Sequence, residues 1–376
     1  MIVREKFFKN ICEYGDIFPI CAIIGPRQCG KTTLALEYAK RFDGYHHFDL
    51  ENPEDFYRLE EDPKLALNDL KGLIIIDEIQ RMPSLFSYLR FHVDQNSENR
   101  FLILGSSSPD LLRQSAESLA GRIGYIELTP FYSDEVGFSK KLWEIGGFPR
   151  AYLAPSNKAS RIWLRQYMNA FLERDLNSMG FKVSSEEMRK LWTMVAHYHA
   201  NLVNYSELGR SLNLSDMTIR KYLQILESSF MVRLLKPWHE NISKRQVKNP
   251  KIYIRDSGIL HALLGVAPED LTHHPKVGAS WEGFALEELI RINQFDKEEC
   301  YFWRTHDGAE LDLLVCKEGK KVGFEFKYNQ LVKLTPSMRF ALEDLKLEKL
   351  TVVTPGERSY PLSDKIYVKG IQALQS

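Results

Sequence analysis

The feature that most constrains this chain is a glycine-rich loop between an apolar run and a helical pattern. Residues 20–24 form a continuous apolar run, and residues 33–39 have the composition of a helix. Between them the sequence fits G-x-x-x-x-G-K-T, with the residues Gly25, Pro26, Arg27, Gln28, Cys29, Gly30, Lys31 and Thr32, followed by Thr33. Such a loop directs backbone N–H groups and a helix N-terminus at phosphate oxygens. The pattern predicts an α/β domain that binds ATP through these residues; the alternative is a tight turn without a phosphate.

A second motif supports the nucleotide interpretation. Residues 73–76 are four apolar residues, and Asp77 and Glu78 follow them directly. In a nucleotide site Lys31 would neutralise the β- and γ-phosphates, Thr32 would ligate Mg²⁺, and Asp77 would hold the ion through water. Glu78 would orient and polarise the attacking water. An acidic pair at a strand end is common, so it becomes informative only together with Lys31.

Two further features belong to the same predicted domain. Apolar runs at residues 45–50 and 101–104 complete a parallel sheet that helices cover on both faces. Ser107 follows the last run and could sense the γ-phosphate, although the serines there would equally cap a helix. Arg122 could stabilise transition-state charge in its own subunit or in a neighbouring one, and the second role would require a homo-oligomer. The alternative is an ordinary surface arginine.

Composition limits the partners and the compartment. The 50 Lys and Arg residues balance 50 Asp and Glu residues, so any nucleic-acid site must be local. No stretch reaches the roughly 18 apolar residues that span a bilayer, so we expect a cytoplasmic protein without membrane contact. The five cysteines include no C-x-x-C pair, so we expect reduced thiols. Cys29 is interpreted as a small filler, or as a point of oxidation if its pKa is lowered.

The middle of the chain has a helix-turn-helix pattern. Residues 205–212 and 216–223 predict two short amphipathic helices with Ser206 and Ser215 as caps, and residues 230–235 and 251–254 predict the strands of a wing. A DNA-binding role would use residues of the second helix and of the basic loop, namely Thr218, Arg220, Lys221, Lys244, Arg245 and Lys248. The alternative is a lid or a surface for a protein partner.

The C-terminal part predicts a second α/β unit with a carboxylate cluster. A helix around residues 281–292 precedes strands at 301–304, 311–315 and 322–326, and a further helix and a strand at 350–353 follow. Glu282, Asp312, Glu325 and Lys327 have the spacing of a D…E-x-K nuclease site, where the carboxylates would bind Mg²⁺ or Mn²⁺ and Lys327 would help activate water. By spacing alone, cross-strand charge pairs on an ordinary sheet are the favoured explanation.

Taken together, the motifs at residues 25–33, 75–80 and 119–122 resemble the prokaryotic, archaeal-type AAA+ ATPases with a C-terminal restriction-endonuclease-like domain. The resemblance extends over nearly the whole chain, and the segments at residues 301–305, 310–312 and 323–327 look like that C-terminal domain. It implies a P-loop AAA+ core (residues 1–138), a helical and winged-helix middle domain (139–272) and a PD-(D/E)XK nuclease-like α/β domain (273–376). Such a tail either cleaves DNA or is retained for binding.

Two functions remain open at this point. In the first, the protein is an ATP-driven DNA-processing enzyme that cleaves phosphodiesters at Asp312, Glu325 and Lys327. In the second, ATP switches the association of the downstream domains with a protein partner or with DNA that is not cleaved.

Overall fold

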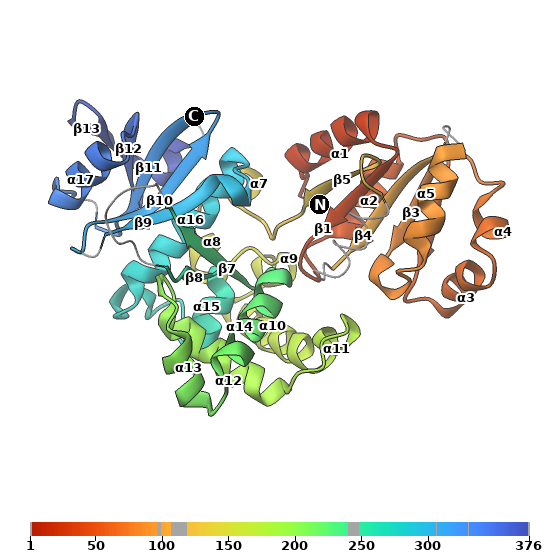
Figure 1. The fold of residues 1–376 in the computed structure, drawn as a ribbon, viewed down its shortest axis with the longest axis horizontal. Helices are drawn as coiled ribbons and strands as arrows, with labels where there is room; N and C mark the ends of the chain where they lie inside the picture. Colours follow the sequence, from red (N-terminus) through yellow and green to blue (C-terminus); the bar gives the residue numbers. More distant parts are fainter. Residues whose placement is uncertain are drawn as a thin grey trace. The chain divides into compact units, whose positions relative to one another are not determined.

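The computed structural model describes residues 2–95, 99–106, 119–239, 248–305, 307–329 and 331–374. These residues form two compact units, which the chain enters more than once (Figure 1). Unit 1 consists of Met1–Phe131, Ala170–Val183 and Ser228–Phe230, and unit 2 consists of Tyr132–Asn169, Ser184–Glu227 and Met231–Ser376. Within the described ranges, every helix is too short or too polar to cross a membrane.

In its described part, unit 1 is built on a five-stranded sheet in which every paired strand runs parallel. The strand order is β2-β3-β4-β1-β5, with the bounds β1 Ile20–Ile24, β2 Tyr45–Asp49, β3 Leu73–Asp77, β4 Arg100–Gly105 and β5 Ile123–Glu127. The apolar runs of β1 and β3 are buried throughout, as strands covered on both faces require. The helices packed with the sheet are α1 Glu5–Ile17, α2 Lys31–Ala39, α3 Pro53–Glu61, α4 Pro63–Leu67 and α5 Leu85–Gln95.

The strand order decides which loops meet. Because β4 lies between β1 and β3 and all three are parallel, their carboxyl ends share one edge of the sheet. The loops that follow β1, β3 and β4 carry the glycine-rich sequence, Glu78 and Ser106. In open α/β sheets this edge is the usual place for a ligand.

The middle segment of unit 2 combines three helices with a small antiparallel sheet. The helices are α12 Ser185–Tyr198, α13 Tyr205–Leu212 and α14 Asp216–Ser228. Strand β8 (Lys251–Ile254) lies between β6 (Asn201–Leu202) and β7 (Val232–Pro237). Upstream of this segment the chain forms α7 Ser133–Val136, α8 Lys140–Ile145, α9 Pro149–Tyr152, α10 Asn157–Ala170, the π-helical turn η2 Phe171–Asp175 and α11 Leu176–Ser178.

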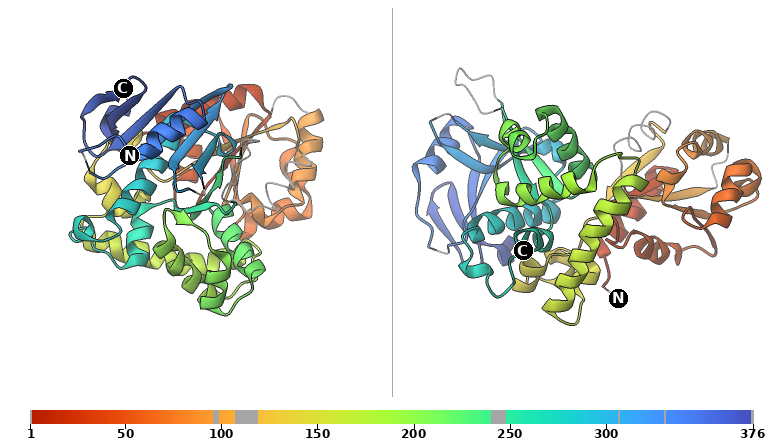
Figure 2. Two further views of the ribbon diagram at one scale, coloured as in Figure 1. Left: turned by 60° about the vertical axis from the view of Figure 1, so that its left-hand side comes forward. Right: turned by 90° about the horizontal axis from the view of Figure 1, so that it is seen from below.

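The C-terminal segment extends the same sheet. Strand β9 (Cys300–Arg304) pairs in parallel with β7, so the described strands of unit 2 form one nine-stranded sheet in the order β13-β14-β12-β11-β10-β9-β7-β8-β6. Figure 1 labels most of these strands, and Figure 2 shows the chain from two further sides. The remaining elements are α15 Ser257–Leu264, α16 Val277–Asn293, β10 Glu310–Lys317, β11 Lys320–Phe326, α17 Pro336–Asp344, β12 Lys349–Thr354, β13 Ser359–Ser363 and β14 Ile366–Gly370. The expected boundary at residue 272 therefore separates segments that share a sheet.

Candidate functional site

The glycines of the loop after β1 are required by its geometry. A Cβ on Gly25 would lie 2.1 Å from the carbonyl oxygen of Leu128, so no side chain fits there. Gly30 has φ +100° and is the N-cap of α2, a backbone conformation that favours glycine. The loop thereby follows the strand closely and ends at the N-terminus of α2, where N–H groups lack partners within the helix.

Lys31 is held inside this loop. Its side chain is buried, and Nζ donates hydrogen bonds of 3.0 Å to the carbonyl oxygens of both Gly25 and Pro26. The ammonium group thus lies at the loop backbone rather than in solvent, where it can neutralise an anion that the loop binds.

Arg4, which the sequence reasoning did not identify, braces the loop from α1. Its guanidinium donates to the carbonyl oxygens of Cys29 (3.1 Å) and Thr129 (2.8 Å) and lies over the rings of Phe7 and Phe131. Cys29 is fully buried, and burial raises the pKa of its thiol. The raised pKa of this buried thiol favours the interpretation of Cys29 as a small filler over the alternative of a point of oxidation, which requires a lowered pKa.

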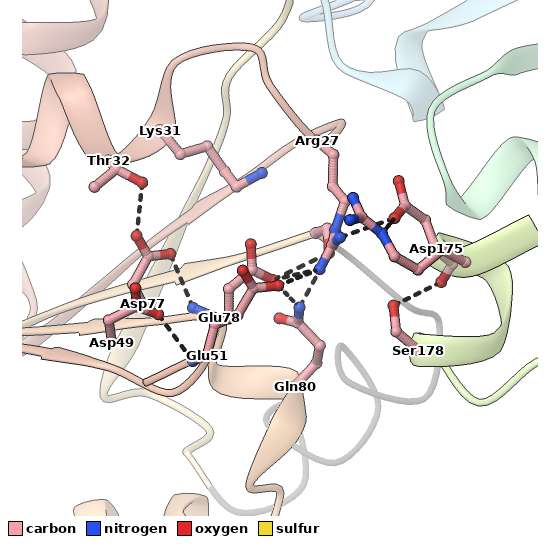
Figure 3. Close-up of polar contacts among 12 residues, drawn as sticks. Arg27, Lys31, Thr32, Asp49, Glu51, Asp77, Glu78, Gln80, Asp175 and Ser178 are labelled. Atoms are coloured by element: carbon pink, nitrogen blue, oxygen red, sulfur yellow. Dashed lines mark hydrogen bonds and ion pairs between the residues drawn. The ribbon is translucent and has the colours of Figure 1, made fainter. Parts of the chain in front are cut away.

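Thr32 and Asp77 meet beside the loop (Figure 3). The Thr32 hydroxyl donates a 2.6 Å hydrogen bond to Asp77 Oδ2, and the backbone N–H of Glu78 donates to Asp77 Oδ1 at 2.8 Å. A hydroxyl and a carboxylate oxygen at the end of a phosphate-binding loop are ligands that suit Mg²⁺. The residues present therefore fit a magnesium ion delivered with a nucleotide.

Glu78 is positioned by two polar neighbours. Its backbone is left-handed (φ 55°), and its Oε2 accepts hydrogen bonds from the Gln80 side-chain amide and, at 3.5 Å, from the Ser106 hydroxyl. Gln80 also donates to Ser106 at 3.0 Å. Burial raises the pKa of Glu78, and the positive charges of Lys31 and Arg27 oppose that shift. Ser107, the predicted sensor, lies outside the described residues. Among the described residues, Ser106, directly after β4, contacts Glu78.

Arg27 links the loop to a distant part of the chain (Figure 3). Its guanidinium donates to Asp175 Oδ1 (2.8 Å) and Glu51 Oε1 (2.8 Å) and lies 3.8 Å from Glu78 Oε2. Asp175 is 2% exposed and ends the π-helical turn η2, which belongs to unit 1. π-helical turns recur at functional positions. No local sequence signal identified this partner.

Arg122 lies at the opposite edge of the sheet. It precedes β5 and donates to both carboxylate oxygens of Asp94, at 2.6 and 3.0 Å. The register pairs Ile20 with Ile123 and Ile24 with Glu127, so Arg122 is roughly 13 Å or more from the glycine-rich loop, the length of a strand. The expected role in cis is therefore corrected, and a role in a neighbouring subunit stays a prediction.

The described residues that were predicted to contact DNA lie on α14 (Thr218, Arg220 and Lys221) and shortly before β8 (Lys248). Lys221 and Lys248 are exposed, and the Arg220 guanidinium lies 3.7 Å from the centre of the Tyr205 ring. Ser215 caps α14 by accepting from the Thr218 backbone at 3.1 Å, and the two hydroxyls also bond at 2.9 Å. Asn204, rather than the predicted Ser206, caps α13. Lys244 and Arg245 lie outside the described residues.

The structure brings the four predicted C-terminal residues together in unit 2. Asp312 on β10 accepts a 3.1 Å hydrogen bond from the Phe326 backbone of β11, and Lys327 Nζ lies 2.9 Å from Glu325 Oε2. Burial and the charge of Asp312 raise the pKa of Glu325 to about 8 and that of Glu282 to about 7. Burial alone would raise the pKa of Asp312, but the ammonium groups of Lys251 and Lys327 lower it.

An unpredicted lysine stands among these carboxylates. Lys251 on β8 is 2% exposed, and its Nζ lies 3.2 Å from both Glu282 Oε1 and Asp312 Oδ1 and pairs with Glu310. Among the residues that the structure describes, no three His, Cys, Asp or Glu side chains are arranged to hold a metal ion. The metal site predicted from Glu282, Asp312 and Glu325 does not fit, because an ammonium group already bonds two of its three carboxylates.

Comparison with protein families divides the chain into three matched stretches. Residues 18–137 match the AAA domain, residues 139–270 match a domain of unknown function (DUF8612), and residues 277–374 match another domain of unknown function (DUF4143). The descriptions of the two domains of unknown function name no activity.

Whole-chain comparisons give relatives in several bacteria. The uncharacterized proteins Mb2031c of Mycobacterium bovis and Rv2008c of Mycobacterium tuberculosis are each 48% identical over 352 residues, which covers 93% of this chain and 79% of theirs. An uncharacterized protein of Haemophilus influenzae is 23% identical over 88% of each chain.

Among solved structures, the Walker-type ATPase PABY2304 of Pyrococcus abyssi is similar in fold. It covers 70% of this chain and 96% of its own, with a TM-score of 0.51 and 14% sequence identity. Together with the AAA match, this confirms the prediction of an α/β, parallel-sheet, AAA+ P-loop ATPase domain, which implies ATP binding and usually Mg²⁺.

Proposed function

Because the chain belongs to the family that includes the mycobacterial proteins Mb2031c and Rv2008c, and has an AAA+ P-loop domain, we propose that it binds MgATP and hydrolyses it in unit 1. The observation that carries this proposal is the 2.6 Å contact between Thr32 and Asp77, directly beside the buried Lys31 and followed by Glu78. The four side chains have the chemistry that phosphoryl transfer to water requires.

Each residue has a separate task in the proposed reaction. The loop N–H groups and Lys31 bind and neutralise the phosphates, while Thr32 and Asp77 would hold Mg²⁺. That ion, when bound, would neutralise charge on the phosphate oxygens. Glu78 orients a water molecule and accepts its proton, and Gln80 and Ser106 hold the Glu78 carboxylate in place. The raised pKa of Glu78 suits a group that must accept a proton.

The experiment that tests this proposal is phosphate release and nucleotide binding by the wild type and Lys31→Ala. Wild type should bind a fluorescent ATP analogue and release phosphate only when Mg²⁺ is present. Lys31→Ala should lose nucleotide binding, since the loop then lacks its cation. Equal nucleotide binding by both proteins would refute the proposed site.

For the middle segment we propose a winged helix that contacts DNA. The order α12, β6, α13, α14, β7, β8, with β8 between β6 and β7, supports this interpretation. Thr218, Arg220 and Lys221 on α14 would approach the groove, while Lys248, with Lys244 and Arg245 shortly before it in the sequence, would contact phosphates. The alternative, a surface for a protein partner, predicts no retention on DNA even at low salt.

The C-terminal segment has the element order α16, β9, β10, β11, α17, β12, which supports a restriction-endonuclease-like fold. Of the two functions left open by the sequence, the position of Lys251 favours the switch, in which ATP controls binding to DNA that is not cleaved. Linear, branched and single-stranded DNA incubated with ATP and Mn²⁺ should therefore be retained but remain intact. Cleavage that disappears in Lys327→Ala would instead support a nuclease. We also propose the domain limits 1–138, 139–272 and 273–376, and a role for Arg122 in the nucleotide site of a neighbouring subunit.

A further inference from the structure

The carboxylate cluster of unit 2 is neutralised from within the chain. Lys251 Nζ contacts Glu282 on α16 and Asp312 on β10 at 3.2 Å each, and it also pairs with Glu310 on β10. Lys251 comes from β8, so its ammonium joins the middle segment to two elements of the C-terminal segment. At 2% exposure this ammonium is not a mobile surface group.

The hydrogen-bonding capacity of the cluster is largely used. An ammonium group has three N–H donors, and Lys251 has three carboxylate partners. Glu282 Oε1 also accepts from the Tyr253 hydroxyl at 2.7 Å, and Asp312 Oδ2 accepts from the Phe326 backbone at 3.1 Å. A divalent cation would compete with Lys251 for the same oxygens, and the displaced ammonium would lose three partners in a buried site.

The fourth carboxylate has a cation of its own. Glu325 Oε2 pairs with Lys327 at 2.9 Å, and Glu325 is 5% exposed. A metal ion that used Glu325 and Asp312 would thus have to break two lysine pairings. The geometry is that of a closed ion-pair cluster in which lysine ammonium groups occupy the positions where metal ions would otherwise bind.

We propose that the Lys251 ammonium is the resident cation of this cluster, in place of a divalent metal, and that it fastens β8 to α16 and β10. The C-terminal segment is therefore a binding module that does not cleave phosphodiesters with a metal. This inference deepens the proposed non-cleaving role of that segment. It does not depend on ATP hydrolysis in unit 1, so the failure of either can be recognised separately.

The test is a Mn²⁺ titration without nucleotide, in which electron paramagnetic resonance measures free Mn²⁺. All proteins carry Asp77→Asn, which removes the carboxylate proposed to hold the ion in unit 1. With Lys251 intact, no Mn²⁺ binding that depends on Glu325 is expected. Binding that Glu325→Gln abolishes in this protein would overturn the proposal, whether or not any Lys251 variant folds.

Two variants of Lys251 test whether Mn²⁺ binds once the ammonium group is removed. Lys251→Ala removes the ammonium and should bind Mn²⁺ and melt at a higher temperature when Mn²⁺ is added. Lys251→Arg keeps a cation at the site and should show neither effect. A folded Lys251→Ala protein that gains no Mn²⁺ binding would contradict the idea that the ammonium stands in for the metal.

Discussion

The Thr32 hydroxyl donates a 2.6 Å hydrogen bond to Asp77 Oδ2 and so joins two motifs that lie 45 residues apart. The contact follows from the strand order, because β4 separates β1 from β3 and all three end at the same edge. It brings a hydroxyl, a carboxylate and the base Glu78 to the loop that contains Lys31.

Gln80 positions the base, so Gln80→Ala should slow ATP hydrolysis while nucleotide binding is retained. The Gln80 amide donates to both Glu78 and Ser106. A hydrogen bond to a charged group contributes about 1.5–3 kcal/mol, so turnover should fall at least about 10-fold. Steady-state phosphate release and ATP affinity, measured side by side, check this. A fall in affinity with unchanged turnover would show that Gln80 acts on binding instead.

Arg27 and Asp175 should be energetically coupled. Asp175 is 2% exposed, and removing Arg27 takes away its 2.8 Å partner and leaves it the more exposed Arg174 guanidinium at 3.3 Å. Breaking a buried pair costs about 3–5 kcal/mol, and contacting residues show coupling energies of about 0.5–3 kcal/mol. A double-mutant cycle of Arg27→Ala and Asp175→Ala should therefore be non-additive.

The double-mutant cycle needs a signal that follows the unfolding of unit 1, because Arg27 and Asp175 both lie in that unit. All six tryptophans of the chain lie in unit 2, so tryptophan fluorescence follows that unit alone. Circular dichroism reports the unfolding of both units. The transition that appears in circular dichroism but not in tryptophan fluorescence therefore gives the free energy of unfolding of unit 1. Additive losses in the double variant would mean that the 2.8 Å contact contributes nothing measurable.

The two buried histidines of unit 2 should each lower its stability as the pH falls below about 6.5, the ordinary pKa of histidine, while the raised pKa values of Glu282 and Glu325 act in the opposite direction. Burial lowers the pKa of His199 to about 3 and that of His261 to about 4. Both rings stay neutral in the folded protein at pH 5.5 and gain a proton on unfolding. Stability present above pH 6.5 is thus lost as the pH falls, by about 1.4 kcal/mol per histidine between pH 7.5 and 5.5.

Urea unfolding followed by tryptophan fluorescence measures this loss. His261 Nδ1 bonds the carbonyl of Glu144 at 2.9 Å and Nε2 bonds the Ser280 hydroxyl at 2.7 Å, contacts that a glutamine can partly replace. Between pH 7.5 and 5.5, the change in the free energy of unfolding of His261→Gln should therefore be more favourable to the folded state than that of the wild type by about 1.4 kcal/mol. An identical pH dependence in both proteins would exclude His261 as a cause.

If α14 contacts DNA, Lys221→Ala should weaken binding to all sequences alike. Lys221 is exposed, and a lysine that contacts phosphate contributes about 0.9 to the slope of log affinity against log salt. The salt slope should decrease by about that amount, as fluorescence anisotropy of labelled duplexes can measure. Lys190→Ala is the control, because Lys190 is an exposed lysine of α12 that pairs with Glu186. An equal change in both variants would point to net charge rather than to a contact.

Local sequence patterns predicted most of the central strands. The run at residues 20–24 is β1, and the runs at 73–76 and 101–104 fall within β3 and β4, because each is buried along its whole length. Strand β5 was missed, since its sequence Ile-Gly-Tyr-Ile-Glu has neither a continuous apolar run nor a regular alternation. Strand β13 was missed for a related reason, because most of its residues are exposed.

The contacts that were missed depend on tertiary packing. Arg27 and Asp175 are 148 residues apart, and Lys251 and Asp312 are 61 residues apart. No spacing rule links residues at such separations. Lys251 was assigned to a strand of the wing, and only the pairing of β7 with β9 brings that strand next to the carboxylates of the C-terminal segment.

We propose that Glu78 activates water for ATP hydrolysis at the site formed by Lys31, Thr32 and Asp77. The most direct measurement is steady-state phosphate release by the wild type and Glu78→Gln, with ATP affinity measured on the same preparations. Since general-base catalysis contributes on the order of 10²–10⁴ in rate, Glu78→Gln should bind MgATP with unchanged affinity and turn it over at least about 100-fold more slowly. Equal turnover by the two proteins would contradict the account.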